Sequence, residues 1–542
     1  MITGALTTTD HGAVAIIDGT QISCDWEIIE KIAQSYDYRE HLTLWTDDAE
    51  KAFVRLIGDN IREGTKLAIG TGALKAFHVG KIHVRGIEGY AENLIGDICR
   101  DFGFEPDASG RMKSALKFIG EIGRHTRAMG LDKPKGTGAA NAHEIWRTAF
   151  NPSGRWRCPQ DEGAAEEIDF VREALYGGKT VSNLNGCIYT PGNMPAAIVE
   201  NLGCPAFETP PGFKIWRIDA RSAYPSEMRR DLPSPYSGVT EDFNIDCKHG
   251  VARVRIRVNS DGPRVVPLRL IGDGGVRTIW PGPGCTVEGV YSYFTLREAE
   301  KYGAVIEHVY EARSYAYSTH PLKRFVQRVW DTQKDIDKPT VRKSVKSFGR
   351  RLNGRFAVSR WKSELVPLYK YFDLLKIDPT APMPRMVVGD FCVQRERQEK
   401  YPAHSQVLWS ISTIDRATIV LSRIEHSLEA AGLRVLYTDT DSVMFIAREG
   451  PDGAPDVPGD VKARMGDALG QYRVDWVGDW AVIFGPKFYA LDNGKCSFAG
   501  IPNDIQSELL HNGVARYEQK ETVFSKARTI TFRLSAGKIE EA

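Results

Sequence analysis

The chain has 542 residues, which is too long for one small hydrophobic core and predicts a globular protein of several domains. Its hydrophobic content of 42% and charged content of 26% are ordinary, and they exclude an extensively disordered chain. Lys and Arg total 71 against 70 for Asp and Glu, so the net charge alone indicates no class of partner.

Cysteine usage and hydropathy set further limits. The 9 cysteines form no CxxC pair and no CxxC…HxxxH arrangement, which argues against a structural zinc site or a disulfide framework. The N-terminal residues lack a basic and apolar leader, and no apolar run is long enough to cross a bilayer. We therefore expect a cytoplasmic protein with no membrane partner.

The first elements in the chain predict an α/β domain over residues 1 to about 170. Apolar runs such as AVAII and KLAIG indicate strands, and AEKAFVRLIGDNI indicates a helix. A passage rich in Gly, Pro and Asn follows, YGGKTVSNLNGCIYTPGN, and it marks a connector.

Beyond the connector, FKIWRIDARSAYPSEM indicates a strand that runs into a turn and a helix. From Pro321 to Phe356 the pattern is helical, with a break near Lys338 and Pro339. Twelve Lys and Arg against three Asp between His320 and Arg360 give a net charge of +9 (12 − 3). Such a run suits phosphate binding, although a solvated basic face is the alternative.

An amphipathic helix and a hairpin come next. Between Thr413 and Gly432 apolar residues recur every three or four positions, and Gly432 is a suitable C-cap. The stretch VLYTDTDSVMFIA (435–447) then predicts two buried strands, with Asp439 and Asp441 at their turn.

These two acidic residues have two interpretations. Asp is common in turns because it hydrogen-bonds its own backbone. Alternatively, clustered carboxylates hold Mg²⁺, a hard cation that also binds substrate phosphates. Asp219, at the end of the strand in WRIDARS, is the candidate for a further metal ligand, because two carboxylate-held metals stabilise in-line phosphoryl transfer.

The basic stretch contains the groups that a triphosphate needs. Arg342, Lys346 and Arg350 recur every four residues, so we expect them on one face of a helix. Lys334 lies upstream of the break at Pro339.

Three motifs resemble family B DNA polymerases. DARSAYPS (219–226) resembles their motif A, DxxSLYPS, and YTDTDS (437–442) matches their motif C, YxDTDS. PKFYAL (486–491) resembles their KxY motif and supplies Lys487 and Tyr489. The basic helix lies between motifs A and C, where motif B (KxxxNSxYG) is expected, and the likeness covers roughly residues 170–540.

Motif B departs from the family pattern. Alignment on GRFA places Lys346 on the motif lysine, but it puts Arg350 on the usual Asn and Asn353 on the usual Tyr. The phosphate-binding lysine is therefore retained, while the pocket for the nascent base pair is altered.

The resemblance implies a role for each matching residue. Asp219 and Asp441 would bind two Mg²⁺ ions, with Mn²⁺ as a substitute, and Asp439 would support the metal site or the primer terminus. Tyr224 would exclude the 2′-hydroxyl of a ribonucleotide. The remaining implied contacts are to the nucleotide or the DNA, through Ser222, Lys334, Arg342, Lys346, Tyr176, Gly177, Gly178, Arg416, Lys487 and Tyr489.

Other features resemble the protein-primed phage and plasmid branch of the family. These are the YGG element at Tyr176, Gly177 and Gly178, Lys334 as a second triphosphate-binding lysine, and room for a strand-displacement insertion at 357–410. The resemblance implies primer-template DNA and dNTPs as partners, and a terminal protein primer is a further candidate.

The N-terminal domain carries a weaker signal. Family members have a 3′–5′ exonuclease there, and Asp25 and Glu27 in CDWEII resemble its DxE motif. The further acidic motifs are not recognisable, so we expect no active proofreading. A degenerate exonuclease and another α/β module that binds template or partner both stay open.

The predicted fold is a multi-domain α/β and α+β protein, a right-hand polymerase with palm, fingers and thumb behind an N-terminal α/β exonuclease-like domain. The predicted function is DNA-directed DNA synthesis for a phage, a plasmid or a similar element, in the host cytoplasm if phage-encoded. A catalytically impaired nucleic-acid-binding relative and an RNA-templated polymerase are the alternatives. The expected boundaries are 1–175 (N-terminal domain), 176–212 (connector), 213–320 (palm, first part), 321–356 (fingers), 357–410 (insertion), 411–484 (palm, second part) and 485–542 (KxY element and thumb).

Overall fold

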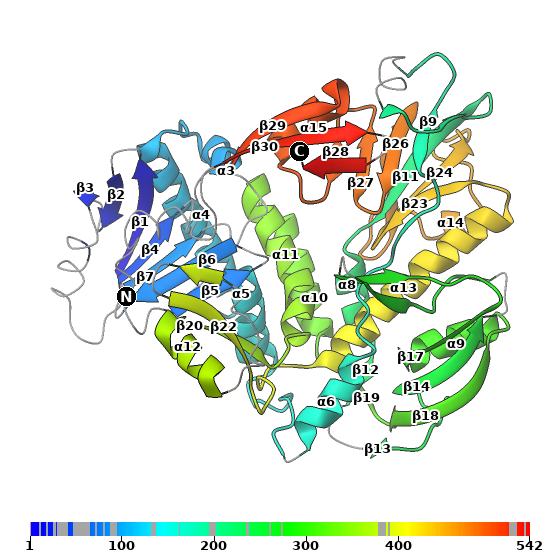
Figure 1. Cartoon of the computed structure of the whole chain (residues 1–542), viewed down its shortest axis with the longest axis horizontal. Helices are drawn as coiled ribbons and strands as arrows, with labels where there is room; N and C mark the ends of the chain where they lie inside the picture. Colours follow the sequence, from blue (N-terminus) through cyan, green and yellow to red (C-terminus); the bar gives the residue numbers. More distant parts are fainter. Residues whose placement is uncertain are drawn as a thin grey trace. The chain divides into compact units, whose positions relative to one another are not determined.

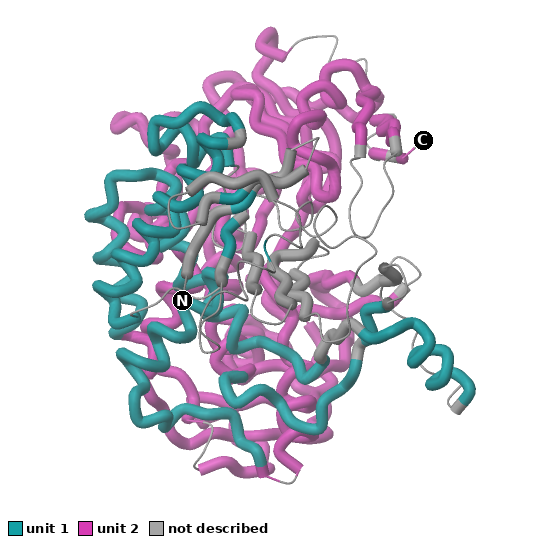
Figure 2. The backbone as a smooth tube through the Cα atoms, turned by 90° about the vertical axis from the view of Figure 1, so that its left-hand side faces the viewer, with its two compact units in different colours: residues 1–160, 324–405, 520–527 teal, residues 161–323, 406–519, 528–542 magenta. Residues whose placement is uncertain are grey.

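A computed structural model shows a mixed α/β protein whose chain divides into two compact units (Figures 1 and 2). Unit 1 comprises Met1–Gln160, Arg324–Ser405 and Lys520–Ala527, and unit 2 comprises Asp161–Lys323, Gln406–Gln519 and Arg528–Ala542. The structure describes residues 2–9, 12–17, 20–24, 29, 42–46, 66–70, 73–79, 82–86, 95–131, 137–161, 163–194, 202–234, 238–258, 262–272, 275–377, 386–388, 391–519, 528–535 and 538–541.

Unit 1 contains a seven-stranded sheet in the order β3-β2-β1-β4-β7-β6-β5 (Figure 1). The three central strands β1, β4 and β7 are parallel, and the outer strands pair antiparallel. The helix α4 packs on β1 and β4. The strands are β1 (Ile2–Thr9), β2 (Gly12–Ile17), β3 (Thr20–Cys24), β4 (Leu42–Thr46), β5 (Lys66–Gly70), β6 (Ala73–Val79) and β7 (Ile82–Gly86). The helices of this part are α3 (Ile95–Phe102), α4 (Ala108–Ala128), α5 (Gly138–Ile145) and the π-helical turn η2 (Trp146–Phe150).

The basic helical stretch also belongs to unit 1. It forms α10 (Lys323–Lys334) and α11 (Pro339–Phe356), so the predicted break before Pro339 is confirmed. Proline suits the first position of α11 because its missing N–H would have no partner there. The N–H of the next residue, Thr340, donates to the Asp101 carboxylate of α3 at 2.8 Å. The contacts of α11 with α3, α4 and α5 explain why 324–405 groups with the N-terminal residues.

A small sheet completes the described part of unit 1. It has the order β20-β22-β21 and lies beside one helix, within the span predicted as an insertion. Its elements are β20 (Trp361–Pro367), α12 (Leu368–Ile377), β21 (Met386–Val388) and β22 (Phe391–Arg397).

Unit 2 is built around a five-stranded antiparallel sheet, β25-β11-β24-β23-β8. Its strands are β8 (Thr180–Ser182), β11 (Phe213–Ala220), β23 (Val435–Asp439), β24 (Ser442–Arg448) and β25 (Tyr472–Gly478). On one face lie α8 (Ala223–Met228) and the long α13 (Val407–Ala430). The predicted helix over 413–432 and the predicted hairpin over 435–447 are therefore confirmed.

The alternation of β24 shows how this sheet is buried on both faces. Val443, Phe445 and Ala447 pack with Leu421 of α13, whereas Met444 and Ile446 pack with residues of a second sheet. Burial on both sides explains the continuous apolar run in the sequence.

The second sheet has the order β10-β9-β26-β27-β28 and carries the C-terminal elements on its far side. It comprises β9 (Gly186–Tyr189), β10 (Ala206–Glu208), β26 (Trp480–Gly485), β27 (Phe488–Leu491) and β28 (Cys496–Phe498). The elements packed with it are α15 (Asn503–Asn512), β29 (Val514–Gln519), β30 (Arg528–Ser535) and β31 (Lys538–Glu541).

The remaining elements of unit 2 include a third sheet, β13-β18-β14-β17, with α9 packed against it, and two two-stranded sheets, β12-β19 and β15-β16. They are α6 (Ala164–Arg172), β12 (Leu232–Pro233), β13 (Val239–Thr240), β14 (His249–Val258), β15 (Leu268–Gly272), β16 (Gly275–Ile279), β17 (Cys285–Ser292), α9 (Tyr293–Lys301), β18 (Val305–Tyr315), β19 (Ser318–Thr319) and α14 (Gly459–Lys462). Across the described helices of both units, none combines the length and the apolar character needed to cross a membrane.

Candidate active site

The central sheet of unit 2 brings Asp219 and Asp441 to the same end of two neighbouring strands. Asp219 on β11 pairs with Ser442 on β24, the residue next to Asp441. The main-chain N–H of Ala220 donates to the main-chain oxygen of Asp441 at 2.8 Å. Two acidic residues that are more than 200 positions apart in the chain therefore meet through the strand register (441 − 219 = 222).

The turn between β23 and β24 is tight and strained. Asp439 pairs with Ser442, so only Thr440 and Asp441 lie between the strands. Thr440 has a φ of +59°, in the left-handed region that a β-branched residue rarely adopts. A positive φ at the first central residue is the position where type II′ hairpins usually carry glycine.

Asp439 is surrounded by donors. Its carboxylate accepts hydrogen bonds from Thr180 Oγ1 at 2.9 Å, Thr440 Oγ1 at 3.0 Å and the Tyr437 hydroxyl at 3.3 Å. Lys487 Nζ lies 2.9 and 3.0 Å from its two oxygens. These contacts favour a positioning role for Asp439.

The KxY residues join this network from the second sheet. The main-chain N–H of Lys487 donates to the Tyr437 hydroxyl at 2.9 Å, and the Tyr437 and Tyr489 rings lie 5.4 Å apart between centroids. Arg217 of β11 donates to the Tyr489 hydroxyl at 3.0 Å. Motif C and the KxY element are therefore in direct contact.

Backbone strain is concentrated at the predicted motifs. Among the described residues other than glycine, positive φ occurs at Ser222 (62°), Thr440 (59°) and Lys487 (62°). These residues belong to motif A, motif C and the KxY element, respectively. Each such conformation costs on the order of 1–3 kcal/mol and is typically retained where function needs it.

The YGG element packs against both acidic motifs. A Cβ atom on Gly178 would lie 2.7 Å from the Tyr224 hydroxyl and 2.8 Å from Thr440 Oγ1, so only glycine fits there. Tyr176 stacks on Tyr291 at 5.7 Å between centroids. Gly177 takes a φ of 87°.

The carboxylates raise the pKa of nearby buried phenols. Burial raises the pKa of Tyr224, and the charges of Asp441 and Asp439 raise it further. Burial and the charge of Asp441 also raise the pKa of Tyr472. This end of the sheet is thus electronegative, and its phenols stay protonated at neutral pH.

This electronegative end fits a divalent cation. Asp219 and Asp441 offer the carboxylate oxygens that Mg²⁺ prefers, one from the end of β11 and the other from the turn before β24. No group of three or more His, Cys, Asp or Glu side chains suited to a metal occurs in the described ranges. The two carboxylates would therefore need water or substrate oxygens to complete the coordination of Mg²⁺.

Arg416 and Asp415, adjacent on α13, are both buried. Arg416 donates to the main-chain oxygen of Asp231 at 2.6 Å and lies over the Phe294 ring at 4.2 Å. This geometry favours a structural role for Arg416 over the DNA contact that its sequence position predicts. Burial raises the pKa of Asp415 to about 7, although hydrogen bonds from Ser292 and Thr295 lower it.

The predicted phosphate-binding residues lie in unit 1. Arg342, Lys346 and Arg350 of α11 are exposed, while the positions between them are largely buried, so their expected common face is confirmed. Lys334, at the end of α10, is half exposed and lies 3.5 Å from Asp331. Asn353 is buried.

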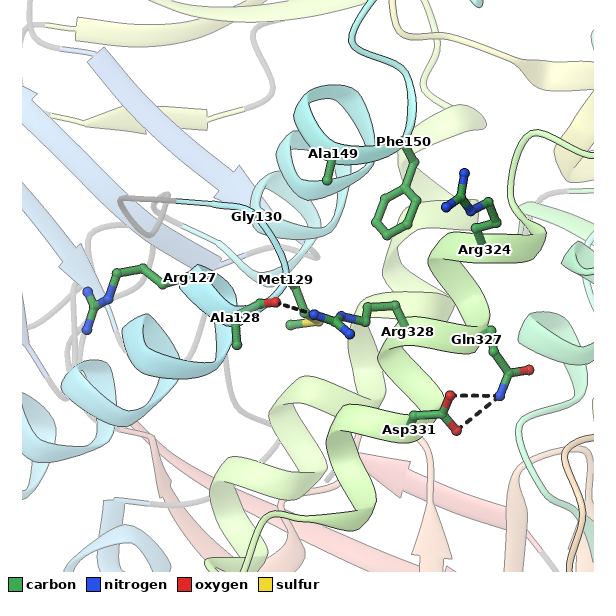
Figure 3. A pocket seen from close by; sticks show the side chains of 10 residues that line it. All are labelled: Arg127, Ala128, Met129, Gly130, Ala149, Phe150, Arg324, Gln327, Arg328 and Asp331. Atoms are coloured by element: carbon green, nitrogen blue, oxygen red, sulfur yellow. Dashed lines mark hydrogen bonds between the residues drawn. The ribbon is translucent and has the colours of Figure 1, made fainter.

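A separate pocket of about 590 Å³ lies in unit 1, between the end of α4 and the face of α10 (Figure 3). Arg328 reaches across it to the main-chain oxygen of Ala128 at 2.8 Å, and Asp331 accepts from Gln327. None of the residues predicted from the motifs lines this pocket. Asp25 and Glu27, the exonuclease candidates, lie outside the described residues.

Sequence patterns do not single out Lys179 and Thr180, although both hold the turn at Thr440. Thr440 N–H donates to the main-chain oxygen of Lys179 at 2.6 Å. Their position directly after the YGG element is the sequence feature that could have marked them as functional.

Comparison with known proteins agrees with this geometry at the level of the fold. No family model matches the sequence, and neither does any curated protein. Among solved structures, Phi29 DNA polymerase complexed with primer-template DNA matches with a TM-score of 0.67, at 13% identity over 98% of this chain and 100% of that chain. This chain is similar in fold to Phi29 DNA polymerase.

Two further Phi29 DNA polymerase structures give the same result. The ternary complex with primer-template DNA and incoming nucleotide substrates and the orthorhombic crystal form each match with a TM-score of 0.68, at 13% identity over 98% of this chain and 100% of theirs. The polymerase fold expected from the short motifs is thereby confirmed.

The buried Asp415 predicts a pH-dependent stability. Its pKa is about 7 in the folded state and about 4 in the unfolded state, so the folded state holds the proton between these values. Its contribution to stability is therefore largest below about pH 4 and is lost as the pH rises through about 7. We expect Asp415→Asn to gain roughly 1–4 kcal/mol relative to wild type between pH 5 and pH 8, measured by urea unfolding.

The exposed Asp456 supplies the control, because Asp456→Asn removes a carboxyl without changing a buried site. A difference between Asp415→Asn and wild type that stays constant from pH 5 to pH 8 would contradict the assignment.

The packing at Gly178 predicts a steric defect. An alanine there must displace Tyr224 or Thr440, which should destabilise unit 2 by about 1–3 kcal/mol in urea unfolding. Gly459→Ala is the matched control, since a Cβ at Gly459 meets no atom within 4 Å. Equal stability of the two variants would show that the contact at Gly178 is not rigid.

Proposed function

We propose that the chain is a template-directed DNA polymerase that adds dNMPs to a primer 3′-hydroxyl. The observation that carries this proposal is the β11–β24 register, which sets Asp219 beside Asp441 at one end of the sheet. The similarity in fold to Phi29 DNA polymerase, solved with primer-template DNA and incoming nucleotides, supports the choice of substrate.

Asp219 and Asp441 would hold two Mg²⁺ ions, with Mn²⁺ as a substitute. Bound there, the ions would supply charge neutralisation for phosphoryl transfer and lower the pKa of the primer hydroxyl. Main-chain pairing fixes the backbone at Asp219 and Asp441, so both residues would be in place before substrate binds.

Lys487 would contact the primer strand. Its ammonium group is half exposed and is held at the Asp439 carboxylate, while its main chain is fixed by the Tyr437 hydroxyl. Asp439 therefore orients a cation toward phosphate and is not needed as a metal ligand. Tyr489, held by Arg217, would support the same strand.

Tyr224 would select the sugar of the nucleotide. Its phenol packs against Gly178, so the ring has little freedom to move away from a 2′-hydroxyl. Ser222, in its left-handed conformation before α8, would present backbone and side-chain groups to phosphate.

The exposed face of α11 would bind the triphosphate through Arg342 and Lys346, with Lys334 as a further cation. On this proposal, 321–356 acts as fingers, the central sheet of unit 2 as palm and the C-terminal elements as thumb. The span 357–410 would assist strand displacement, and a terminal protein is one candidate primer in a phage, a plasmid or a similar element. Proofreading by the N-terminal domain is not part of the proposal.

Primer extension tests the proposal. Wild type should extend a primed DNA template with Mg²⁺ and dNTPs, and Asp441→Ala should lower the rate by at least about 10²-fold because a metal ligand is lost. Asp452→Ala is the matched control, since Asp452 forms a surface ion pair with Lys462 in the same unit.

The outcomes separate the alternatives. DNA binding without extension by wild type would favour a catalytically impaired polymerase relative. Extension on a primed RNA template in preference to DNA would favour an RNA-templated enzyme.

A further inference from the structure

Lys179 is a buried cation at the centre of unit 2. Its side chain is 1% exposed, although lysine is almost never fully buried unless it is paired. Its ammonium group contacts the Glu425 carboxylate, Ser422 Oγ at 2.9 Å and the main-chain oxygen of Arg264 at 3.1 Å. All three donors of the ammonium group therefore have partners.

The partners tie the segment after the YGG element to α13. Glu425 and Ser422 are three residues apart on this helix, which packs against β23 and β24. Burial lowers the pKa of Lys179, and the Glu425 charge opposes that effect. The ammonium and the carboxylate stabilise each other as a charged pair in the interior.

The main chain of the same segment holds the motif C turn. The carbonyl of Lys179 accepts from Thr440 N–H at 2.6 Å, and the next residue, Thr180, donates to Asp439. β8 then continues along β23, with Thr180 opposite Asp439. Thr440 is the strained residue of this turn. Its N–H donates to the carbonyl of Lys179, and the side chain of Lys179 is anchored in the core.

Stability alone does not account for this arrangement. A buried ion pair is often no more stabilising than apolar side chains of similar volume, because both charges lose their hydration. Its advantage is fixed geometry, since three directed hydrogen bonds allow Lys179 one position. The geometry matters most where a strained turn must be held.

We propose that Lys179 is a positioning residue, whose buried pair with Glu425 anchors the left-handed turn at Thr440 and so sets the place of Asp439 and Asp441. The catalytic part of this inference rests on the proposed function, because it concerns the same carboxylates. The anchoring part concerns the folded chain alone and has its own measurement.

The main variant replaces both charges. Lys179→Met alone leaves the Glu425 carboxylate buried without its cation and can prevent folding. The double variant Lys179→Met with Glu425→Leu removes both charges at similar volume, so its thermal midpoint should stay near that of wild type. Lys214→Met is the matched control, because Lys214 pairs with Glu449 on the surface of the same sheet, where both side chains are nearly half exposed.

Hydrogen exchange measures directly how firmly Lys179 holds the turn at Thr440. In the double variant, the peptide over residues 435–447 should exchange ~10-fold faster than in wild type, because the Thr440 N–H loses its fixed acceptor. A peptide over residues 472–478, from β25, should exchange at the wild-type rate, and Lys214→Met should change neither peptide.

Primer extension measures the effect of the double variant on catalysis. The double variant should lower kcat by ~10-fold with the KM for dNTP changed less than ~2-fold, since the nucleotide-binding groups are untouched. A residue that only stabilises the fold would leave kcat unchanged once the variant is folded.

Each outcome bears on one of the two proposals. Wild-type exchange over 435–447 in a folded double variant would overturn the anchoring role of Lys179, whether or not wild type extends primers. Faster exchange with unchanged kcat would overturn its role in positioning the acids. Faster exchange in a chain whose wild type extends no primer supports the anchor and counts against the polymerase proposal instead.

Discussion

The register between β11 and β24 is the constraint on which the candidate site depends. One set of main-chain hydrogen bonds sets Asp219 opposite Ser442 and joins Ala220 to Asp441. A slip of one residue would turn every side chain of β11 to the other face and separate the two carboxylates. Burial of both faces of the sheet, by α13 on one side and by the second sheet on the other, prevents that slip.

Around this register, the structure holds several residues in unfavourable conformations. Ser222, Thr440 and Lys487 all have positive φ, and the main chains of Thr440 and Lys487 are bound by groups from other elements. Thr440 is bound by the carbonyl of Lys179, and the main chain of Lys487 is bound by Tyr437. The backbone strain is confined to single residues, while the groups that hold these residues in place come from other parts of the chain.

Local sequence patterns predicted much of this unit and missed the contacts that organise it. Apolar spacing predicted α13 and the hairpin, and the motifs predicted the roles of Asp219 and Asp441. Both kinds of signal are local properties of the sequence. The burial of Arg416 and the anchoring by Lys179 depend on partners more than a hundred residues away, which no local pattern encodes. The grouping of 324–405 with the N-terminal residues was missed for the same reason, since it rests on contacts of α11 with α3, α4 and α5.

Locating the metal ions tests the proposed site directly. Crystals of the protein with primer-template DNA, a non-hydrolysable dNTP and Mn²⁺ would show the ions by anomalous scattering. We expect Mn²⁺ bound by the carboxylates of both Asp219 and Asp441, with Asp439 still paired to Lys487. Ordered DNA and nucleotide with Mn²⁺ bound away from these two carboxylates would contradict it.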